Sequence, residues 1–146
     1  MNEKKSLPST SANAGERIDI DVVRTVQALS SEIRLDKLIE TLMVLALEHA
    51  GAERGLLILP HGDEQRIEAE AMAGGAPTVR LRTAPVTAAE LPESVLRYVI
   101  QKQDTVILND AAMVGRFAAD PYVQQRHTRS ILCLPLVKQN ALSGVL

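Results

Sequence analysis

The fold is decided by the stretch SILCLPLV (residues 130–137), together with the polar KQN (138–140) and the apolar ALSGVL (141–146) that follow it. An uninterrupted apolar run suits a strand that is covered on both faces, and a short polar break before a second apolar run predicts a hairpin. We therefore place this hairpin at the centre of a sheet. Because Pro135 cannot donate to the hydrogen-bond ladder, we expect a bulge beside it. The sequence stops at Leu146 within the apolar run, which leads us to expect a fragment of a longer protein.

The composition is that of one soluble domain with its own core, since 46% of the 146 residues are hydrophobic and 23% are charged. A net charge of −2 with interspersed signs argues against a nucleic-acid partner. The N-terminus lacks the apolar region of a signal peptide, and no apolar run approaches membrane-spanning length. We therefore expect a cytoplasmic protein without membrane insertion. The single cysteine, Cys133, excludes an internal disulfide, and in a buried strand its thiol is expected to be inert.

The N-terminal third is expected to be helical after a disordered lead. Residues 1–16 are small and polar, so we assign the lead to 1–16 and the folded domain to 17–146. Apolar residues then recur at spacings of four, three and four, which places a narrow stripe on one face of a helix: Val22, Val26, Leu29 and Ile33. This stripe is equally consistent with packing on the domain's own sheet and with a homodimer seam through the N-terminal helix.

A second helix is predicted over residues 35–49, separated from the first by a break at Ser30-Ser31 with Asp36 as a possible cap. Gly51 supplies the left-handed residue that ends it. Three short strands are expected next, at residues 54–60, 66–71 and 79–82.

The second and third of these strands alternate charges in a way that predicts their register. If they pair antiparallel about the loop at 74–77, Glu68 faces Arg82 and Glu70 faces Arg80.

The remaining elements complete a mixed fold. Thr87 to Glu90 has the spacing of a capping box, which predicts a helix after Pro92. A strand is expected at 105–108, and Asp120-Pro121 is a strong helix start. The predicted fold class is α+β, a sheet with helices packed on it.

Several segments resemble a GAF domain, a small sensory module related in shape to PAS domains. The resemblance covers the chain from about Ile20 to its end and rests on residues 35–39, 50–55, 92–95, 106–110, 130–136 and 144–146. It implies a GAF/PAS-like antiparallel sheet with packed helices, here with the last strand and the closing helix incomplete. Residues 50–59 and 130–136 further resemble the GAF domain of large hybrid bacterial sensor histidine kinases. That likeness implies a two-component signalling protein with an attached kinase.

No catalytic constellation is visible in the sequence. The motifs of phosphoryl transfer are absent, the three histidines are widely separated, and no metal site or cofactor is predicted, although a single axial histidine for haem remains open. Cys133 lacks the following histidine of bilin-binding relatives, and the signature of cyclic-nucleotide-binding relatives is not matched. We therefore expect no enzyme activity in this chain.

A ligand pocket is predicted between the sheet and residues 109–129. Its candidate binding residues are Asn109, Phe117, Arg126, His127 and Arg129. The arginines are suited to grip an anion, whereas the competing interpretation is a solvated helix end whose cations complement the helix dipole. Two functions follow, a sensor for an unidentified small molecule or a ligand-free dimerisation and relay module.

Overall fold

The computed structural model describes residues 10–113 and 115–146, and for residues 10–21, 32 and 33 it describes the backbone alone. The elements follow in the order α1 (Thr10–Ala50), β1 (Arg54–His61), β2 (Glu64–Met72), β3 (Thr78–Pro85), α2 (Glu93–Lys102), β4 (Val106–Leu108), α3 (Pro121–Arg126), β5 (Ile131–Cys133), β6 (Pro135–Lys138) and β7 (Ala141–Val145). The described residues divide into two units, the first ending at residue 38 and the second covering residues 39–146, and the sheets lie in the second.

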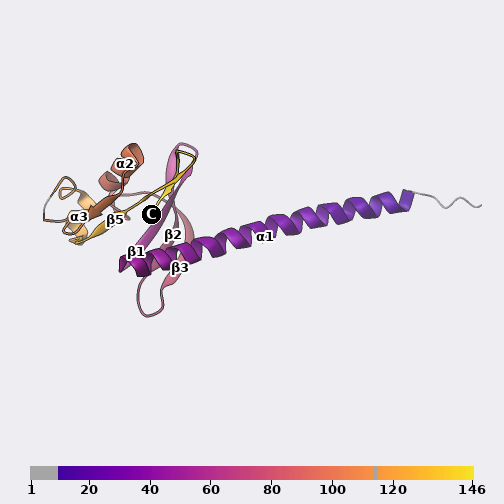
Figure 1. The fold of residues 1–146 in the computed structure, drawn as a ribbon, viewed down its shortest axis with the longest axis horizontal. Helices are drawn as coiled ribbons and strands as arrows, with labels where there is room; N and C mark the ends of the chain where they lie inside the picture. The colour runs from indigo at the N-terminus through magenta and orange to yellow at the C-terminus, as the bar shows by residue number, and fades with distance from the viewer. Residues whose placement is uncertain (1–9, 114) are drawn as a thin grey trace, which may run out of the picture. The chain divides into compact units, whose positions relative to one another are not determined.

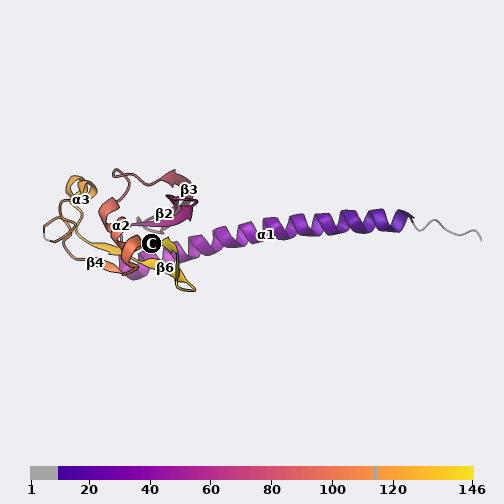
Figure 2. The ribbon, with the colours of Figure 1, turned by 90° about the horizontal axis from the view of Figure 1, so that it is seen from above.

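The second unit contains two antiparallel sheets. The larger has the strand order β3-β2-β1-β7-β6, and the smaller pairs β4 with β5. Both views show α2, α3 and the β4–β5 ribbon together on one side of β1, β2 and β3 (Figure 1, Figure 2). This arrangement confirms the predicted α+β class with an antiparallel sheet.

Each face of the large sheet has its own apolar core because side chains alternate along a strand. On one face, Val95 and Val99 of α2 join Ile67 of β2 in a cluster of buried residues. On the other, Met43 and Leu47, from the last part of α1, pack with small residues of β2, which a register shift after Ile67 turns to the face opposite that residue. The sheet therefore lies between the two helices that cover it.

Helix α1 corrects the prediction of two helices. It runs from Thr10 to Ala50 without the break expected at Ser30-Ser31, and it includes residues 10–16 of the predicted disordered lead. The Ser31 hydroxyl donates to the Gln27 carbonyl one turn earlier, so this serine is satisfied inside the helix instead of ending it. Residues 1–9 lie outside the described part of the chain.

The predicted C-terminal stop of α1 is confirmed. Gly51 has a φ of 62°, its N–H donates to the Glu48 carbonyl, and the Ala52 N–H donates to the Leu47 carbonyl. These two bonds form a Schellman motif, which satisfies carbonyls that the helix leaves without partners.

The charge-based register of β2 and β3 is half correct. Glu70 lies opposite Arg80 as predicted, but a register shift between Ile67 and Ala69 removes the pairing of Glu68 with Arg82. Two residues of β3 lie opposite Glu68 at this bulge, so Arg82 turns to another partner. The Thr83 hydroxyl donates to Glu68 instead.

The apolar stretch of residues 130–137 is two strands instead of one. β5 belongs to the small sheet and β6 is an edge strand of the large one, so the predicted central position is wrong. Leu134 links them and exchanges two backbone hydrogen bonds with Leu146, of 2.7 and 2.9 Å. Pro135 thus begins an edge strand, where a missing N–H is tolerated, and the register shift expected near it follows Leu136.

The predicted C-terminal hairpin is confirmed as β6–β7. Gln139 and Asn140 both have positive φ, of 50° and 62°, as a type I′ turn requires.

The predicted capping box at Thr87 is wrong, because α2 starts at Glu93 with Pro92 at its N-cap. The Thr87 carbonyl accepts from the N–H groups of Glu90 and Leu91, which makes the segment a turn.

Candidate functional site

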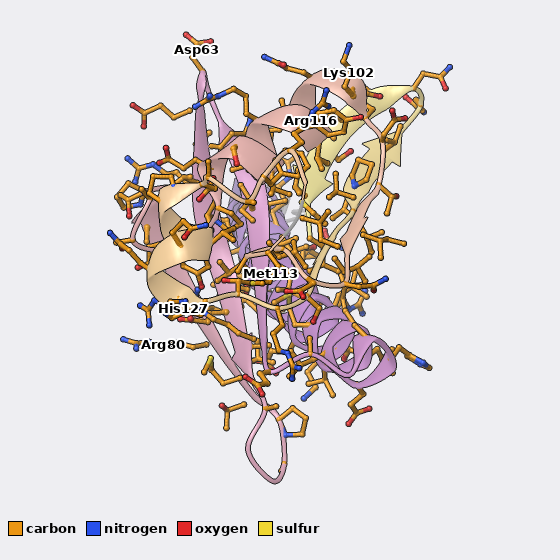
Figure 3. The ribbon with its side chains drawn as sticks, turned by 90° about the vertical axis from the view of Figure 1, so that its left-hand side faces the viewer. Asp63, Arg80, Lys102, Met113, Arg116 and His127 are labelled. Carbon is orange, nitrogen blue, oxygen red and sulfur yellow. The ribbon has the colours of Figure 1, made fainter. Side chains whose placement is uncertain are left out.

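A shallow, open hollow of about 320 Å³ lies between α2 and the loop that precedes α3. It is lined mostly by long polar side chains: Ser94, Arg97, Tyr98, Gln101, Lys102, Arg116 and Phe117. Figure 3 shows two of the labelled cations of this hollow, Lys102 and Arg116, close to each other at the top of the view. This size is at the lower end for small-molecule sites.

The residues from α2 reach the hollow because the helix is amphipathic. Val95, Leu96 and Val99 are buried against the sheet. The hollow-lining residues of α2 recur at three- and four-residue intervals from Ser94, which places them together on another face. Helical spacing thus separates the core-facing residues from those available to a ligand.

An aromatic pair joins α2 to the opposite wall of the hollow. The rings of Tyr98 and Phe117 meet edge to face, with centroids 5.7 Å apart and an interplanar angle of 75°. The guanidinium carbon of Arg116 lies 5.0 Å from the Tyr98 ring centroid, within the range of a cation–π interaction. Because Phe117 is buried in the core, this pair anchors the loop that carries Arg116.

Of the binding residues predicted from the sequence, Phe117 alone lines this hollow. Asn109 is exposed after β4, and Arg129 is exposed before β5. Arg126 lies over the Tyr122 ring at 5.9 Å, and His127 is the left-handed C-cap of α3. Figure 3 places the labelled His127 well below Lys102 and Arg116.

The predicted binding residues around the end of α3 therefore lie apart from the hollow beside α2. His127 donates its backbone N–H to the Val123 carbonyl, and Arg126 occupies the last turn of α3, as expected for a helix end whose cation complements the dipole. A ligand-binding role for Asn109, Arg126, His127 and Arg129 stays a prediction.

Asp120 connects the two helices that border the hollow. One carboxylate oxygen accepts the Tyr122 N–H at 2.9 Å and so caps α3, as its sequence predicted. The other accepts the Ser94 N–H at 3.0 Å and also the Ser94 hydroxyl, so the same side chain caps α2. Burial raises the pKa of Asp120, but the hydrogen bonds from Ser94 and Tyr122 outweigh it and hold this pKa below its ordinary value.

A ring of alternating charges ties the same sheet face to the turn before α2. Arg54 of β1 donates to Glu70 at 2.6 Å and to Glu90 at 2.9 Å. Arg82 of β3 closes the ring, at 3.2 Å from Glu70 and 3.0 Å from Glu90. Arg54 also donates to the Tyr122 hydroxyl at 3.1 Å, which links α3 to the sheet.

The ring shifts the pKa of Glu70. Burial raises the pKa of Glu70, but the hydrogen bond and charge of Arg54, with a smaller effect of Arg82, bring that pKa below its ordinary value. Both guanidinium groups have carboxylate partners, so they serve the fold and are not free to grip an anion.

Cys133 is buried in β5, where the sequence placed it, and burial raises the pKa of its thiol to about 12. A thiol of this kind is protonated near neutral pH and is a poor nucleophile. Within residues 10–113 and 115–146, no group of three or more His, Cys, Asp or Glu side chains is placed to hold a metal ion. No helix among the described residues is long and apolar enough to cross a membrane.

Sequence reasoning missed Arg97, Lys102 and Arg116 as candidate ligand contacts. The sequence shows that polar residues recur at helical intervals along α2, but this pattern is equally typical of a helix face that is simply exposed to solvent. Only the tertiary structure brings Arg116, fourteen or more positions further along the chain, to the same hollow.

Comparison with models of protein families identifies one family for most of the chain. The family model of the GAF domain matches residues 34–146. No curated protein matches the sequence.

Proposed function

The chain belongs to the GAF domain family, and from this premise we propose that it is a non-catalytic sensory domain that binds a small ligand and signals to an attached output domain. GAF domains are generally regulatory or sensory domains and are generally non-catalytic. The observation that carries the ligand-binding part of the proposal is the hollow between α2 and the loop before α3.

The hollow is well placed for a sensor because its walls are coupled to the rest of the unit. Ser94 lines it and also donates to Asp120, which caps α3. Tyr122 of α3 is in turn bonded to Arg54 in the sheet. A ligand that moves α2 therefore has a continuous hydrogen-bonded route to β1, and it shifts the balance between two packings by its difference in affinity for them.

The output domain in this proposal is the core of a sensor histidine kinase in a cytoplasmic two-component system. Support comes from the resemblance of residues 50–59 and 130–136 to the GAF domains of such proteins. The gene tests this assignment, because a histidine kinase core in the same reading frame supports it and a different output domain refutes it.

The alternative function is a ligand-free module that forms a homodimer through the N-terminal helix. Val22, Val26 and Leu29 of the predicted stripe are each more than half exposed on α1, so their side chains are available to a partner helix. The side chain of Ile33, the fourth residue of the stripe, is outside the described part of the structure.

Two measurements on the whole chain separate these functions. A ligand raises the melting temperature in a metabolite screen, because binding to the folded state alone stabilises it. A relay module shows no such shift, but Val26→Asp weakens its dimer in analytical ultracentrifugation. Val23→Asp is the matched control, since Val23 is 53% and Val26 54% exposed while Val23 lies off the stripe. A monomer that no compound stabilises refutes both functions.

A further inference from the structure

The hollow beside α2 collects positive charge from two separate parts of the chain. Arg97 and Lys102 come from α2, and Arg116 comes from the loop before α3. No carboxylate is among the residues that line the hollow. Across the described residues, none of these three cations forms an ion pair, whereas Arg54 and Arg82 are each paired with two glutamates.

The structural roles of helix-end cations explain only part of this cluster. Lys102 lies in the last turn of α2, where a positive charge complements the helix dipole. Arg97 lies in the middle of the helix and Arg116 is outside it, so the dipole explains neither. Like charges brought together without counter-charges repel one another, and a bound anion removes that repulsion.

Arg116 is already oriented before any ligand arrives. Its guanidinium lies over the Tyr98 ring, and Tyr98 is in turn held edge to face by the buried Phe117. The interaction with the ring restrains the side chain but leaves N–H groups free to donate. Less conformational freedom is therefore lost when Arg116 binds an anion.

We propose that this basic hollow binds the phosphate group of a small phosphomonoester, with Arg97, Lys102 and Arg116 as its ligands. A phosphate carries about −1.5 to −2 charges and three strong acceptor oxygens, which matches three cations that line one hollow better than a single carboxylate does. Gln101 supplies a neutral polar group for the rest of the molecule. This inference rests on the proposed sensory function and names its class of ligand.

The test is calorimetric titration of the whole chain with glycerol 3-phosphate and, separately, with inorganic phosphate. We expect saturable binding of glycerol 3-phosphate that weakens as salt is added, because the site is open to solvent. Tighter binding of the ester identifies an esterified phosphate as the ligand, whereas equal binding identifies free phosphate and overturns the phosphomonoester.

Paired variants locate the site. The double variant Arg97→Ala/Arg116→Ala is expected to lose about tenfold or more in affinity, since charge-assisted hydrogen bonds disappear. The double variant Arg126→Ala/Arg129→Ala removes the same charge from the region favoured by the sequence, and it is expected to bind like the parent chain. Equal losses in the two double variants overturn the proposed site. All four arginines are exposed, and a thermal melt of each variant confirms its folding.

The outcomes also distinguish this inference from the sensory function on which it rests. If no phosphate probe binds but another compound in the screen raises the melting temperature, the phosphate site is refuted and the sensory function stands. If no compound of any class binds and the dimer is sensitive to Val26→Asp, the sensory function itself fails in favour of the relay module.

Discussion

The double cap made by Asp120 predicts a large effect from a single substitution. Replacing this carboxylate with alanine removes the acceptor of the Tyr122 N–H and the acceptor of both Ser94 donors. Asp120 is only 7% exposed, so water cannot fully replace these bonds. Two helices therefore lose their N-terminal partner at once.

The magnitude follows from these contacts. Loss of an N-cap costs about 0.5 to 2 kcal/mol, and a buried donor left without a partner costs about 1 to 3 kcal/mol. For Asp120→Ala we expect a loss of about 3 kcal/mol in the free energy of unfolding. Asp120→Asn keeps the shape and one acceptor oxygen, so its expected loss is smaller, about 1 to 2 kcal/mol.

The assay is urea unfolding followed by circular dichroism at pH 7 and at decreasing pH. The pKa of Asp120 is lower in the folded state than in the unfolded state, where it is about 3.9. The stabilisation that the ionised carboxylate gives is therefore complete above the unfolded pKa, and it disappears as pH falls through the folded pKa. The difference in stability between the parent chain and Asp120→Asn should therefore shrink below pH ~4. Glu70 is present in both proteins, so its own titration largely cancels from this difference.

The control is Asp110→Asn, which removes a carboxylate from an exposed position in the same loop. We expect it to change stability by less than about 0.5 kcal/mol. If Asp120→Asn is equally mild at pH 7, or if its deficit does not depend on pH, the argument from the double cap is refuted.

Three other features give predictions. Glu70→Gln should destabilise the domain by about 1 to 3 kcal/mol in urea unfolding, because Arg54 and Arg82 both lose a carboxylate partner in a half-buried ring. Gly144→Ala should cost about 1 to 3 kcal/mol in the same assay, since a Cβ there would lie 2.8 Å from a backbone carbonyl oxygen of β1. Cys133 should react with a thiol reagent at pH 8 only after unfolding, because burial raises its pKa to about 12.

Each of these predictions has a contrary result, and the two substitutions have control variants. The control is Glu64→Gln, which removes the carboxylate of an exposed ion pair and should leave the free energy of unfolding nearly unchanged. If Glu70→Gln changes it just as little, the charged ring adds little to stability. Ser143→Ala is the neighbouring exposed control for Gly144→Ala, and full stability of the latter would mean that β7 can move away from β1. Labelling of Cys133 in the native state at the rate of a free thiol would contradict its burial.

The order of elements was largely predictable because the apolar periodicities are strong and local. Alternation located β2 and β3, and Gly51 marked the end of α1 correctly. The predicted helix break failed because Ser31 bonds back to Gln27, an outcome that the presence of a serine does not exclude. The pairing of Glu68 with Arg82 failed because a bulge leaves no clear signal in local charge alternation.

The candidate site was less accessible to sequence reasoning than the fold. The prediction of Asp120 as a cap was right, but its second role depends on Ser94, 26 positions earlier in the chain. Arg126 and His127 were predicted as binding residues because they are neighbours in the sequence. Adjacency in the sequence does not show whether two side chains point into the same site. Arg116 meets the α2 cations only through the packing of Tyr98 on Phe117, a contact between distant segments.

The single residue between β5 and β6 has a mechanical consequence. Leu134 joins the two sheets and is clamped on both its N–H and its carbonyl by Leu146. One extended residue spans only about 3.3 to 3.6 Å, so the small sheet has almost no slack with which to move independently. Any displacement of β4 and β5 must therefore either break this clamp or pull directly on the end of β7, which makes Leu134 a stiff joint instead of a flexible tether.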